Sequence, residues 1–518
     1  MTNLEHTLAS LPHRYPGPGG AAAVLRHGQV LASHAWGYAD IAARLPFTQQ
    51  TPFLICSITK QFTCALMLDQ VGRPEALDAA VAARLPLLQQ PAPTARELAN
   101  NQSGLRDYWA TAMLAGALPE QVFTNADAAR LIARTRSLHF APGTSYSYCN
   151  QNFRILAELV ADGADRPYAE LLRTRIFDRA GMPHAALNAD TADVAGGTVG
   201  YEGSAEDGFR AAVNNIHWTG DAGIAASLDD LIAWEKHIDA TRDDPASLYA
   251  RLSAPVTFRN AMPAPYGLGL NHNPIAGRPA TSHGGGLRGW RSLRFNLPAE
   301  RLSVVVLFNH MADPRAAALD LLATQLDAPP TPPPSPSPSS PRPFAWSGRY
   351  LDAATGLATR IDATQDHRPR LTYDRGPELL TPATPDHARG PTTQLRAEPD
   401  GLWMDRPTEN TSTRLTPCPG TPTPDIAGTY HSEEYAADLT IAAPGGPLYA
   451  AFSGPLGQGE MQRLDPYGPD LWLMPCPRSL DFGAPGDWTM QIRRNAGRQI
   501  TGVTLGCWLA RNVDYVRK

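Results

Sequence analysis

Apolar residues between positions 21 and 37 form two short runs on either side of a polar pair. The runs AAAVLR and QVLASHAW flank His27 and Gly28, and this pattern predicts a β-hairpin of two buried strands. The longer run LSVVVLFNH, residues 302–310, is rich in β-branched side chains and predicts a central strand. We therefore expect an antiparallel sheet in this part of the chain.

Helical spacing of apolar residues appears in two other segments. FTCALMLDQVG, residues 62–72, places Phe62, Ala65 and Leu68 on one face and predicts a helix that ends near Gly72. In PGTSYSYCNQNFRILAELV, residues 142–160, an amphipathic helix is expected to follow Tyr148 and Asn150. Helices mixed with strands predict an α+β domain, an antiparallel sheet with packed helices, over residues 1–328.

The pattern changes at residues 329–343, where PPTPPPSPSPSSPRP cannot bury a core and favours extended polyproline II. We interpret this stretch as a linker. Beyond it, helical periodicity gives way to short strand-like runs separated by Gly and Pro, which predict an all-β region.

A weak internal repeat divides the all-β region. AWSGRYLDAATGLATRI, from Ala345, and DIAGTYHSEEYAADLTI, from Asp425, align at an offset of eighty residues, with matches at Gly348 and Gly428, Tyr350 and Tyr430, and Ile361 and Ile441. Two small β-barrel domains, at 344–420 and 421–518, are the interpretation, and coincidence in a Gly-rich region is the alternative.

Composition narrows the choice of partners. The chain has 518 residues, 43% of them hydrophobic and 18% charged, which is typical of globular proteins. A net charge of −5 gives no electrostatic reason to expect nucleic acid or an anionic membrane as partner. No apolar run reaches the ~18 residues that span a bilayer, and the N-terminus does not resemble a secretory signal.

The cysteines and motifs also exclude several site types. Six cysteines are scattered without a C-x-x-C pair, which fits reduced thiols and a cytoplasmic location. H-E-x-x-H and G-K-[ST] are absent. Residues 284–289 match G-x-G-x-x-G, but the strand-like WRSLRFN follows where a dinucleotide site needs a helix. The sequence thus predicts neither a metal nor an organic cofactor.

The candidate chemistry begins with a serine three residues before a lysine in FLICSITKQF. Lys60, Lys236 and Lys518 are the lysines of a chain in which Lys and Arg total 45. Arg cannot act as a base, whereas a desolvated Lys can give up its proton. A spacing of three on a helix puts Ser57 and Lys60 on one face, so that a neutral Lys60 can activate Ser57 for attack on a carbonyl.

Two further segments carry candidate polar groups. Alternation would place Tyr148 and Asn150 on one side, where Tyr148 could relay a proton to a leaving group and Asn150 could hold Lys60 or a substrate amide. In TSHGGGLRGWRSLRF, from Thr281, His283 precedes Gly285 and Gly286. These glycines let backbone approach a substrate, and Gly286 could offer an oxyanion N–H. Taken singly, each feature is more typical of a structural loop.

Together, S-x-x-K, Y-x-N and H-x-G resemble the motifs of the penicillin-recognising serine hydrolases, which include class C β-lactamases, D-Ala-D-Ala carboxypeptidases and D-aminopeptidases. HAWGYAD, NNQSGLRDYW, GDAGIAASLDDLIAW and YGLGLN add to the resemblance. It implies Ser57 as acyl-enzyme nucleophile, Lys60 as base, Tyr148 as proton shuttle and a β-lactamase/transpeptidase-like fold.

His283 stands where many of these relatives carry the lysine of K-T-G. A histidine with a reference pKa of about 6.5 is mostly neutral at pH 7. A neutral His283 is therefore a poor anchor for a terminal carboxylate, which disfavours the hypotheses of a carboxypeptidase or a β-lactamase.

Within the family, the layout resembles the bacterial D-aminopeptidases, which carry two eight-stranded barrels after the hydrolase domain. In those enzymes a loop of the last barrel enters the active-site mouth, and an acidic residue there receives the substrate's free α-ammonium group. Residues 474–488 match this loop, and Asp481 takes the acidic position. The resemblance also suggests that Arg478 orients Asp481 or lines the entrance, and that Asn271 lines the site. A solvated loop carboxylate is the alternative for Asp481.

We therefore expect a serine hydrolase without cofactor that releases an N-terminal D-residue, such as D-Ala, from short peptides, amides or esters. Cys56 and Cys149 are expected to be small buried residues rather than nucleophiles. The rivals are a D-stereospecific esterase or amidase, a carboxypeptidase or β-lactamase, and a sensor that is acylated without turnover. A homodimer is a further expectation, and the D preference comes from the resemblance alone.

Overall fold

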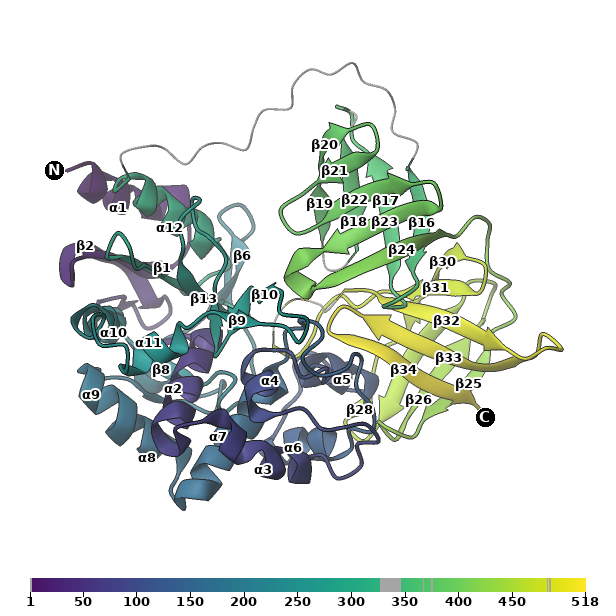
Figure 1. Cartoon of the computed structure of the whole chain (residues 1–518), viewed down its shortest axis with the longest axis horizontal. Coiled ribbons are helices and arrows are strands. Elements are labelled where there is room, and N and C mark those ends of the chain that lie inside the picture. Colours follow the sequence, from purple (N-terminus) through teal and green to yellow (C-terminus); the bar gives the residue numbers. More distant parts are fainter. Residues whose placement is uncertain (1, 327–345, 367, 374–375, 482, 484–485) are drawn as a thin grey trace.

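The computed structural model describes residues 2–326, 346–366, 368–373, 376–481, 483 and 486–518. The part before residue 327 lies to one side of the molecule, and two barrel-like sheets lie next to each other on the other side (Figure 1). The predicted linker at 329–343 lies outside the described residues. Within these ranges, no helix has the length and apolar character needed to cross a membrane.

An eight-stranded antiparallel sheet forms the centre of the first part, in the order β11-β12-β13-β14-β15-β1-β2-β3. Its strands are β1 (Gly19–Arg26), β2 (Gln29–Asp40), β3 (Leu45–Pro46), β11 (Tyr266–Gly267), β12 (Leu270–Asn271), β13 (Thr281–Leu287), β14 (Trp290–Leu297) and β15 (Leu302–Phe308). β15 lies between β14 and β1, and every one of its residues is buried. The prediction of a central strand at 302–310 is confirmed.

The predicted hairpin is β1 and β2, which turn at His27 and Gly28. Both turn residues have positive φ, 52° and 69°, as a tight two-residue hairpin requires. The prediction that both strands are buried is correct for β1 and wrong for β2. β2 lies next to the sheet edge and pairs with the short β3 only at Tyr38 and Asp40, so most of its residues keep contact with solvent.

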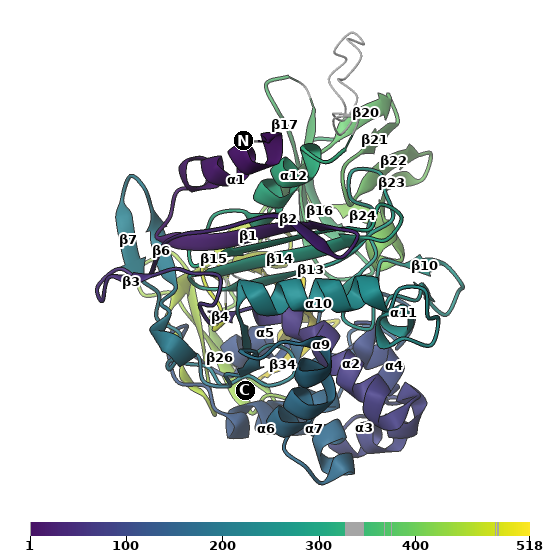
Figure 2. The ribbon, with the colours of Figure 1, turned by 90° about the vertical axis from the view of Figure 1, so that its left-hand side faces the viewer.

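Helices cover both faces of this sheet (Figure 2). On one face, α1 (Asn3–Arg14) and α12 (Pro314–Ala323) bury Leu8 and Leu321 against Phe295 and Val304. On the other face lie α2 (Thr59–Val71), α3 (Asp78–Arg84), α4 (Ala95–Ala99), α5 (Tyr108–Leu114), α6 (Asn125–Ala133), α7 (Asn150–Ala164), α8 (Tyr168–Leu171), a π-helical segment (Leu172–Phe177), α9 (Asp178–Ala180), α10 (Leu228–Ala240) and α11 (Leu248–Leu252).

The predicted helix at 62–72 is the body of α2. It ends at Gly72, whose φ of 72° is a conformation that glycine adopts without steric cost, and whose N–H donates to Leu68 O. Ten consecutive residues of α2, from Thr59 to Leu68, are buried. This helix therefore runs through the core rather than along its surface.

Short sheets complete the first part. β4 (Phe53–Leu54), β8 (Ile224–Ala226) and β5 (Ala186–Leu187) form one small sheet. The other two are the pairs β6 (Tyr201–Ser204) with β7 (Gly208–Ala211), and β9 (Val256–Thr257) with β10 (Pro263–Ala264). β4 leads directly into a 3₁₀ turn at Cys56–Ile58 and then into α2.

The first barrel-like sheet consists of β16 (Gly348–Asp352), β17 (Ala358–Ala363), β18 (Pro369–Thr372), β19 (Pro377–Leu379), β20 (Thr381–Thr384), β21 (His387–Arg389), β22 (Gln394–Glu398), β23 (Gly401–Arg406) and β24 (Thr411–Pro417). β19 pairs with β18, and β20 pairs with β21. Only the buried Leu380 separates β19 from β20, so one bent segment joins both edges of the sheet.

The second barrel-like sheet consists of β25 (Gly428–Ser432), β26 (Ala437–Ala442), β27 (Tyr449–Gly454), β28 (Gly457–Gln458), β29 (Gln462–Arg463), β30 (Asp465–Gly468), β31 (Leu471–Met474), β32 (Trp488–Arg494), β33 (Ile500–Cys507) and β34 (Ala510–Arg517). β29 pairs with β27, β30 pairs with β31, and the buried Leu464 lies between β29 and β30. This sheet is bent at its edges in the same way.

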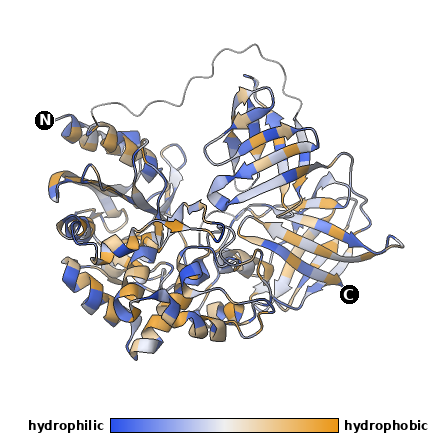
Figure 3. Ribbon diagram, in the orientation of Figure 1, coloured by the Kyte–Doolittle hydropathy of each residue, from blue (hydrophilic) through white to orange (hydrophobic). Residues whose placement is uncertain are grey.

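The internal repeat is present in the strand register. Gly348 pairs with Ile361 in the first sheet, as Gly428 pairs with Ile441 in the second. The two matching tyrosines each donate a hydrogen bond to the carbonyl four residues earlier, at 2.8 Å for Tyr350 and 2.6 Å for Tyr430. Buried and more exposed residues alternate along strands such as β23 and β26. Hydrophobic and hydrophilic residues are mixed along the strands of both sheets (Figure 3). The predicted fold class, a β-lactamase-like α+β part followed by all-β barrels, is confirmed.

Candidate active site

Ser57 lies in the 3₁₀ turn Cys56–Ile58, which continues without a break into α2. This continuous helical path puts residues 57 and 60 on one face, and Lys60 Nζ lies 3.1 Å from Ser57 Oγ. Ser57 is partly exposed, whereas Lys60 is completely buried. The structure thus brings together the two residues that the S-x-x-K motif singled out.

The backbone bends sharply just before the serine. Cys56 has a φ of 50°, a left-handed conformation that costs a non-glycine residue free energy and is enriched at functional sites. Its thiol is buried and contacts Leu54 O at 3.2 Å, and burial raises its pKa. Cys149 is buried as well, so both thiols are the small buried side chains that the sequence predicts.

Two oxygens besides Ser57 Oγ surround the Lys60 amine. Asn150 Oδ1, at the start of α7, lies 2.8 Å from Nζ, and the carbonyl oxygen of Asp221 lies 2.6 Å from it. The amine also lies 4.8 Å from the centre of the Tyr148 ring. These contacts come from two segments far from Lys60 in the sequence, and they fix the ε-nitrogen beside Ser57.

Burial lowers the pKa of Lys60 to about 8, because the charged form loses its hydration. The carboxylates of Asp221, Asp107 and Asp481 act in the opposite direction and favour the ammonium form. A lysine with this pKa is partly neutral near pH 7, in contrast to an exposed lysine.

Tyr148 also contacts the Ser57 side chain. Burial raises the pKa of its phenol well above the usual value, and a hydrogen bond with the Ser57 side chain opposes this shift. The phenol is therefore protonated at neutral pH and lies next to the serine hydroxyl. The Ser57 hydroxyl thus contacts both a lysine amine and a tyrosine hydroxyl.

His283, on β13, completes one wall of the site. Its Nδ1 lies 2.6 Å from Gly284 O and must carry the proton there, so Nε2 accepts from Tyr266 OH at 3.0 Å. Burial, followed by the charge of Lys60, lowers the pKa of the imidazole to about 3. His283 is therefore neutral at pH 7, as the sequence predicts. The centre of its ring lies 6.4 Å from the centre of the Tyr148 ring.

The glycines after His283 lie close to the serine turn. A Cβ on Gly285 would lie 2.1 Å from Ser292 Oγ and 2.3 Å from Ile55 O, so only glycine fits there. Leu287 and Trp290 form the hydrogen-bonded pair that closes a two-residue hairpin turn. Hydrogen-bonded and non-hydrogen-bonded pairs alternate in an antiparallel ladder, so the next pair, Gly286 and Arg291, is not hydrogen-bonded. The N–H of Gly286 therefore points away from β14, toward the free edge of β13.

The loop between β31 and β32 approaches this site from the last barrel. Asp481 O accepts from Arg288 N at 3.3 Å, and its carboxylate accepts from Ser479 Oγ at 2.8 Å. The negative charge of Asp481 acts to raise the pKa of Lys60 and the pKa of Asp107. The structure thus places this acidic side chain near enough to Lys60 to favour its charged form.

Two other predicted site residues have different surroundings. Arg478 pairs with Glu120 at 2.9 Å and with Glu202 at 3.3 Å, so its guanidinium connects the loop to the first part of the chain. Asn271 ends β12 and pairs with Ser282, one position from His283. Neither contributes a hydrogen bond to Ser57 or Lys60 within the described ranges.

Sequence reasoning missed three residues of this site. Asp107, Asp221 and Tyr266 all lie in segments that carried the family resemblance, but none of them was singled out. Tyr266 orients His283, Asp221 supplies a carbonyl to Lys60, and Asp107 accepts from Asn150. Single acidic or aromatic residues in loops carry no spacing signal, so only the three-dimensional arrangement identifies them.

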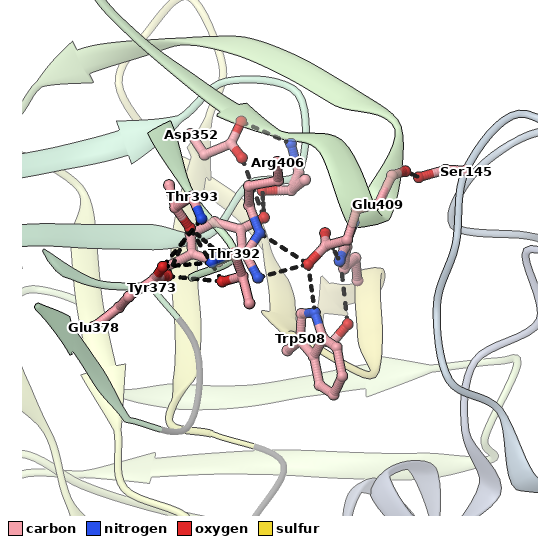
Figure 4. A network of polar contacts seen from close by, with 11 residues as sticks. Ser145, Asp352, Tyr373, Glu378, Thr392, Thr393, Arg406, Glu409 and Trp508 are labelled. Carbon is pink, nitrogen blue, oxygen red and sulfur yellow. Dashed lines mark hydrogen bonds and ion pairs between the residues drawn. The ribbon is translucent and has the colours of Figure 1, made fainter. Parts of the chain in front are cut away.

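Glu409 connects the two barrels and the segment that leads to Tyr148 (Figure 4). Its buried carboxylate accepts from Arg406 Nε at 2.8 Å, Trp508 Nε1 at 3.0 Å and Arg511 Nη2 at 3.1 Å. Its carbonyl oxygen accepts from Ser145 Oγ and from Tyr146 N. The first barrel therefore holds the backbone two residues before Tyr148.

Two family models together match most of the chain. The family model described as Beta-lactamase matches residues 4–328, and the model described as D-aminopeptidase, domain B, matches residues 339–516. Among solved structures, the octameric penicillin-binding protein homologue from Pyrococcus abyssi is similar, with a TM-score of 0.52. It is 19% identical, covers 80% of this chain and 98% of its own, and supports the fold alone.

Full-length relatives are much closer in sequence. A protein named D-aminopeptidase from Gluconobacter oxydans (strain 621H) is 50% identical over 522 residues, covering 99% of this chain and 98% of its own. One of the same name from Brucella canis is 46% identical over 517 residues, covering 100% and 99%. Since these matches extend through both barrels to the end of the chain, it belongs to the D-aminopeptidases of the β-lactamase family.

Proposed function

We propose that this chain is an aminopeptidase that releases an N-terminal D-residue, with D-Ala preferred, from short peptides, amides or esters. The observation that carries the proposal is the 3.1 Å contact between the buried Lys60 amine and the Ser57 hydroxyl. Full-length relatives named D-aminopeptidase supply the substrate class. Ser57, Lys60, Tyr148 and His283 are the proposed catalytic group.

In the proposed reaction, Ser57 Oγ attacks the carbonyl carbon while its proton passes to neutral Lys60. The N–H groups of Ser57 and Gly286 stabilise the oxyanion. The C–N bond breaks as Tyr148 relays the proton to the departing nitrogen, which leaves an ester on Ser57. Water then adds to this ester, its proton restores the serine hydroxyl through Lys60, and the D-amino acid is released.

Asp481 is the proposed partner of the substrate's α-ammonium group. A carboxylate that is partly shielded from water attracts an ammonium group more strongly than a fully exposed one. Its position on a loop from the last barrel, near Lys60 and Asp107, supports this role. A neutral His283 offers no charge for a substrate carboxylate, which disfavours carboxypeptidase activity.

The proposal is tested by comparing D-alaninamide with its N-acetylated form. Acetylation removes the ammonium group but leaves the scissile bond intact, so we expect hydrolysis of the acetylated compound to fall by at least about a hundredfold. The L-alaninamide control tests chirality, and we expect the D compound to be strongly preferred. Equal rates with and without the acetyl group would rule out the aminopeptidase and leave a D-stereospecific esterase or amidase.

The pH dependence of kcat/KM is a second prediction. Lys60 must be neutral to accept the serine proton, so the rate on D-alanine p-nitroanilide should rise as pH increases toward about 8. The substrate's α-ammonium group, with an ordinary pKa of about 8, loses its proton over the same range, so the rate should pass through a maximum near pH 8 and then fall. A profile that is flat from pH 6 to 9 would contradict Lys60 as the base.

We also propose a cytoplasmic location and a homodimer for this chain. The six cysteines are all buried and unpaired, which supports a reducing compartment. The homodimer is an expectation that light scattering of the purified chain would test.

A further inference from the structure

Asp107 has a completely buried carboxyl group beside the catalytic pair, and the proposed proton transfers do not use it. Its Oδ2 accepts from the backbone N of Asn150 at 2.6 Å and from the side-chain Nδ2 of Asn150 at 2.9 Å. Its Oδ1 accepts from Trp109 N at 3.0 Å and caps α5. Both carboxyl oxygens are therefore fixed by hydrogen bonds.

These contacts determine which way the Asn150 amide points. The Nδ2 group faces Asp107, so Oδ1 faces Lys60 and accepts from Nζ at 2.8 Å. With the amide reversed, an NH₂ group would face the amine of Lys60, and the carbonyl oxygen would face a carboxylate. Both contacts would be unfavourable, so the acceptor at residue 107 selects the orientation that holds the amine beside Ser57.

Asp107 is itself held by the last barrel. Its backbone N donates to Leu509 O at 3.0 Å, in the turn between β33 and β34. The preceding buried residue, Arg106, donates to Arg511 O at 2.6 Å and to Asn512 O at 2.8 Å. The hairpin of the second barrel thus fixes the backbone from which the Asp107 side chain extends.

We propose that Asp107 is a positioning residue for the lysine base: it sets the orientation of the Asn150 amide and thereby keeps the Lys60 ε-nitrogen against Ser57. This inference rests on the proposed function, since it assigns a part in the same proton transfer. It extends that function by giving the last barrel a role in placing the base, in addition to the role of its loop at the entrance.

The charge of Asp107 also acts on the amine. The charged groups around Lys60 are Asp221, Asp107 and Asp481. Its other titratable neighbours are Cys56, Cys64, Tyr148, Cys149 and His283. Asp107 in turn lies near Asp481, Tyr108, Tyr148 and Cys149. A carboxylate at 107 favours the ammonium form of Lys60, so its removal should lower the pKa of the lysine.

The rarity of lysine makes this directly measurable. In the full chain labelled with [¹³Cε]lysine, the NMR signal of Lys60 must be distinguished only from the signals of Lys236 and Lys518. In Asp107→Asn we expect the Lys60 midpoint to move to lower pH. We also expect kcat on D-alanine p-nitroanilide to fall by about tenfold to a hundredfold at every pH, because the base is misplaced.

These two changes oppose each other at neutral pH, since more neutral lysine alone would raise the rate. A purely structural role would not move the titration. The matched control is Asp230→Asn, which removes another buried capping carboxylate, bonded to Ser227, in α10. It should leave both the Lys60 midpoint and kcat unchanged, while both variants lower the melting temperature.

An unchanged midpoint and an unchanged kcat in Asp107→Asn would overturn the inference, and so would equal shifts in Asp230→Asn. If the wild type does not cleave the D-alanine substrate, the proposed function fails. The Lys60 titration still tests the coupling between Asp107 and the lysine in that case, because it does not depend on turnover.

Discussion

Ser57→Ala should reduce the hydrolysis of D-alanine p-nitroanilide by about a millionfold in kcat, because removal of the nucleophile from a serine hydrolase disables the whole catalytic group. The Ser57 side chain is partly exposed and accepts from Lys60. Its loss therefore removes the reacting oxygen and costs little packing. Steady-state kinetics on the purified variant would measure the effect.

Cys56→Ser is the matched control for this prediction. Cys56 is adjacent to the nucleophile, but its thiol contacts Leu54 O, in the interior. Serine is close in size, so we expect kcat within about tenfold of the wild type. A variant pair with the reverse outcome, active without the Ser57 hydroxyl and inactive without the Cys56 thiol, would show that the nucleophile is a cysteine.

Lys60→Met is expected to lower kcat by about a hundredfold to ten-thousandfold, which is the usual contribution of a positioned general base. Methionine has a similar length and suits a completely buried position, so the fold should survive. Asn150 Oδ1 and Asp221 O then lose their common donor, and we expect a modest fall in melting temperature.

Lys60→Arg separates the base from the cation. The guanidinium keeps a positive charge but does not give up its proton, so this variant should be as inactive as Lys60→Met. Lys236→Arg is the control, because Lys236 is exposed on α10 and should tolerate the change. Substantial activity in Lys60→Arg would mean that the amine acts only through its charge, and Tyr148 would then be the better candidate for the base.

Much of the fold was predictable because its signals are local. The turn at His27 and Gly28, the end of α2 at Gly72 and the buried strand β15 each follow from a few neighbouring residues. The repeat of Gly348 and Gly428 was visible because both begin a strand with the same partner register. The exposure of β2 was not predictable, since it depends on which strand pairs with it.

The contact between Ser57 and Lys60 was predictable for a similar reason. Ser57 and Lys60 are three residues apart, so helix geometry alone brings them together. Asp107, Asp221 and Tyr266 reach the site from separate loops, and no spacing in the sequence relates them to Lys60. Their contributions depend on tertiary packing, which pattern analysis of one chain does not resolve.

The two barrels contact each other and the first part of the chain through equivalent corners. The β23–β24 turn carries Glu409, the β33–β34 turn carries Trp508, and these residues hydrogen-bond to each other. These equivalent turns hold different segments of the first part of the chain. The β23–β24 turn holds the backbone before Tyr148, and the β33–β34 turn holds the backbone of Asp107. Neither copy is then a separable module. Deleting the last barrel would remove Arg511 and Trp508 from the buried Glu409 carboxylate and leave Arg406 as its cationic partner, so the first barrel would lose two of the contacts that fix this carboxylate.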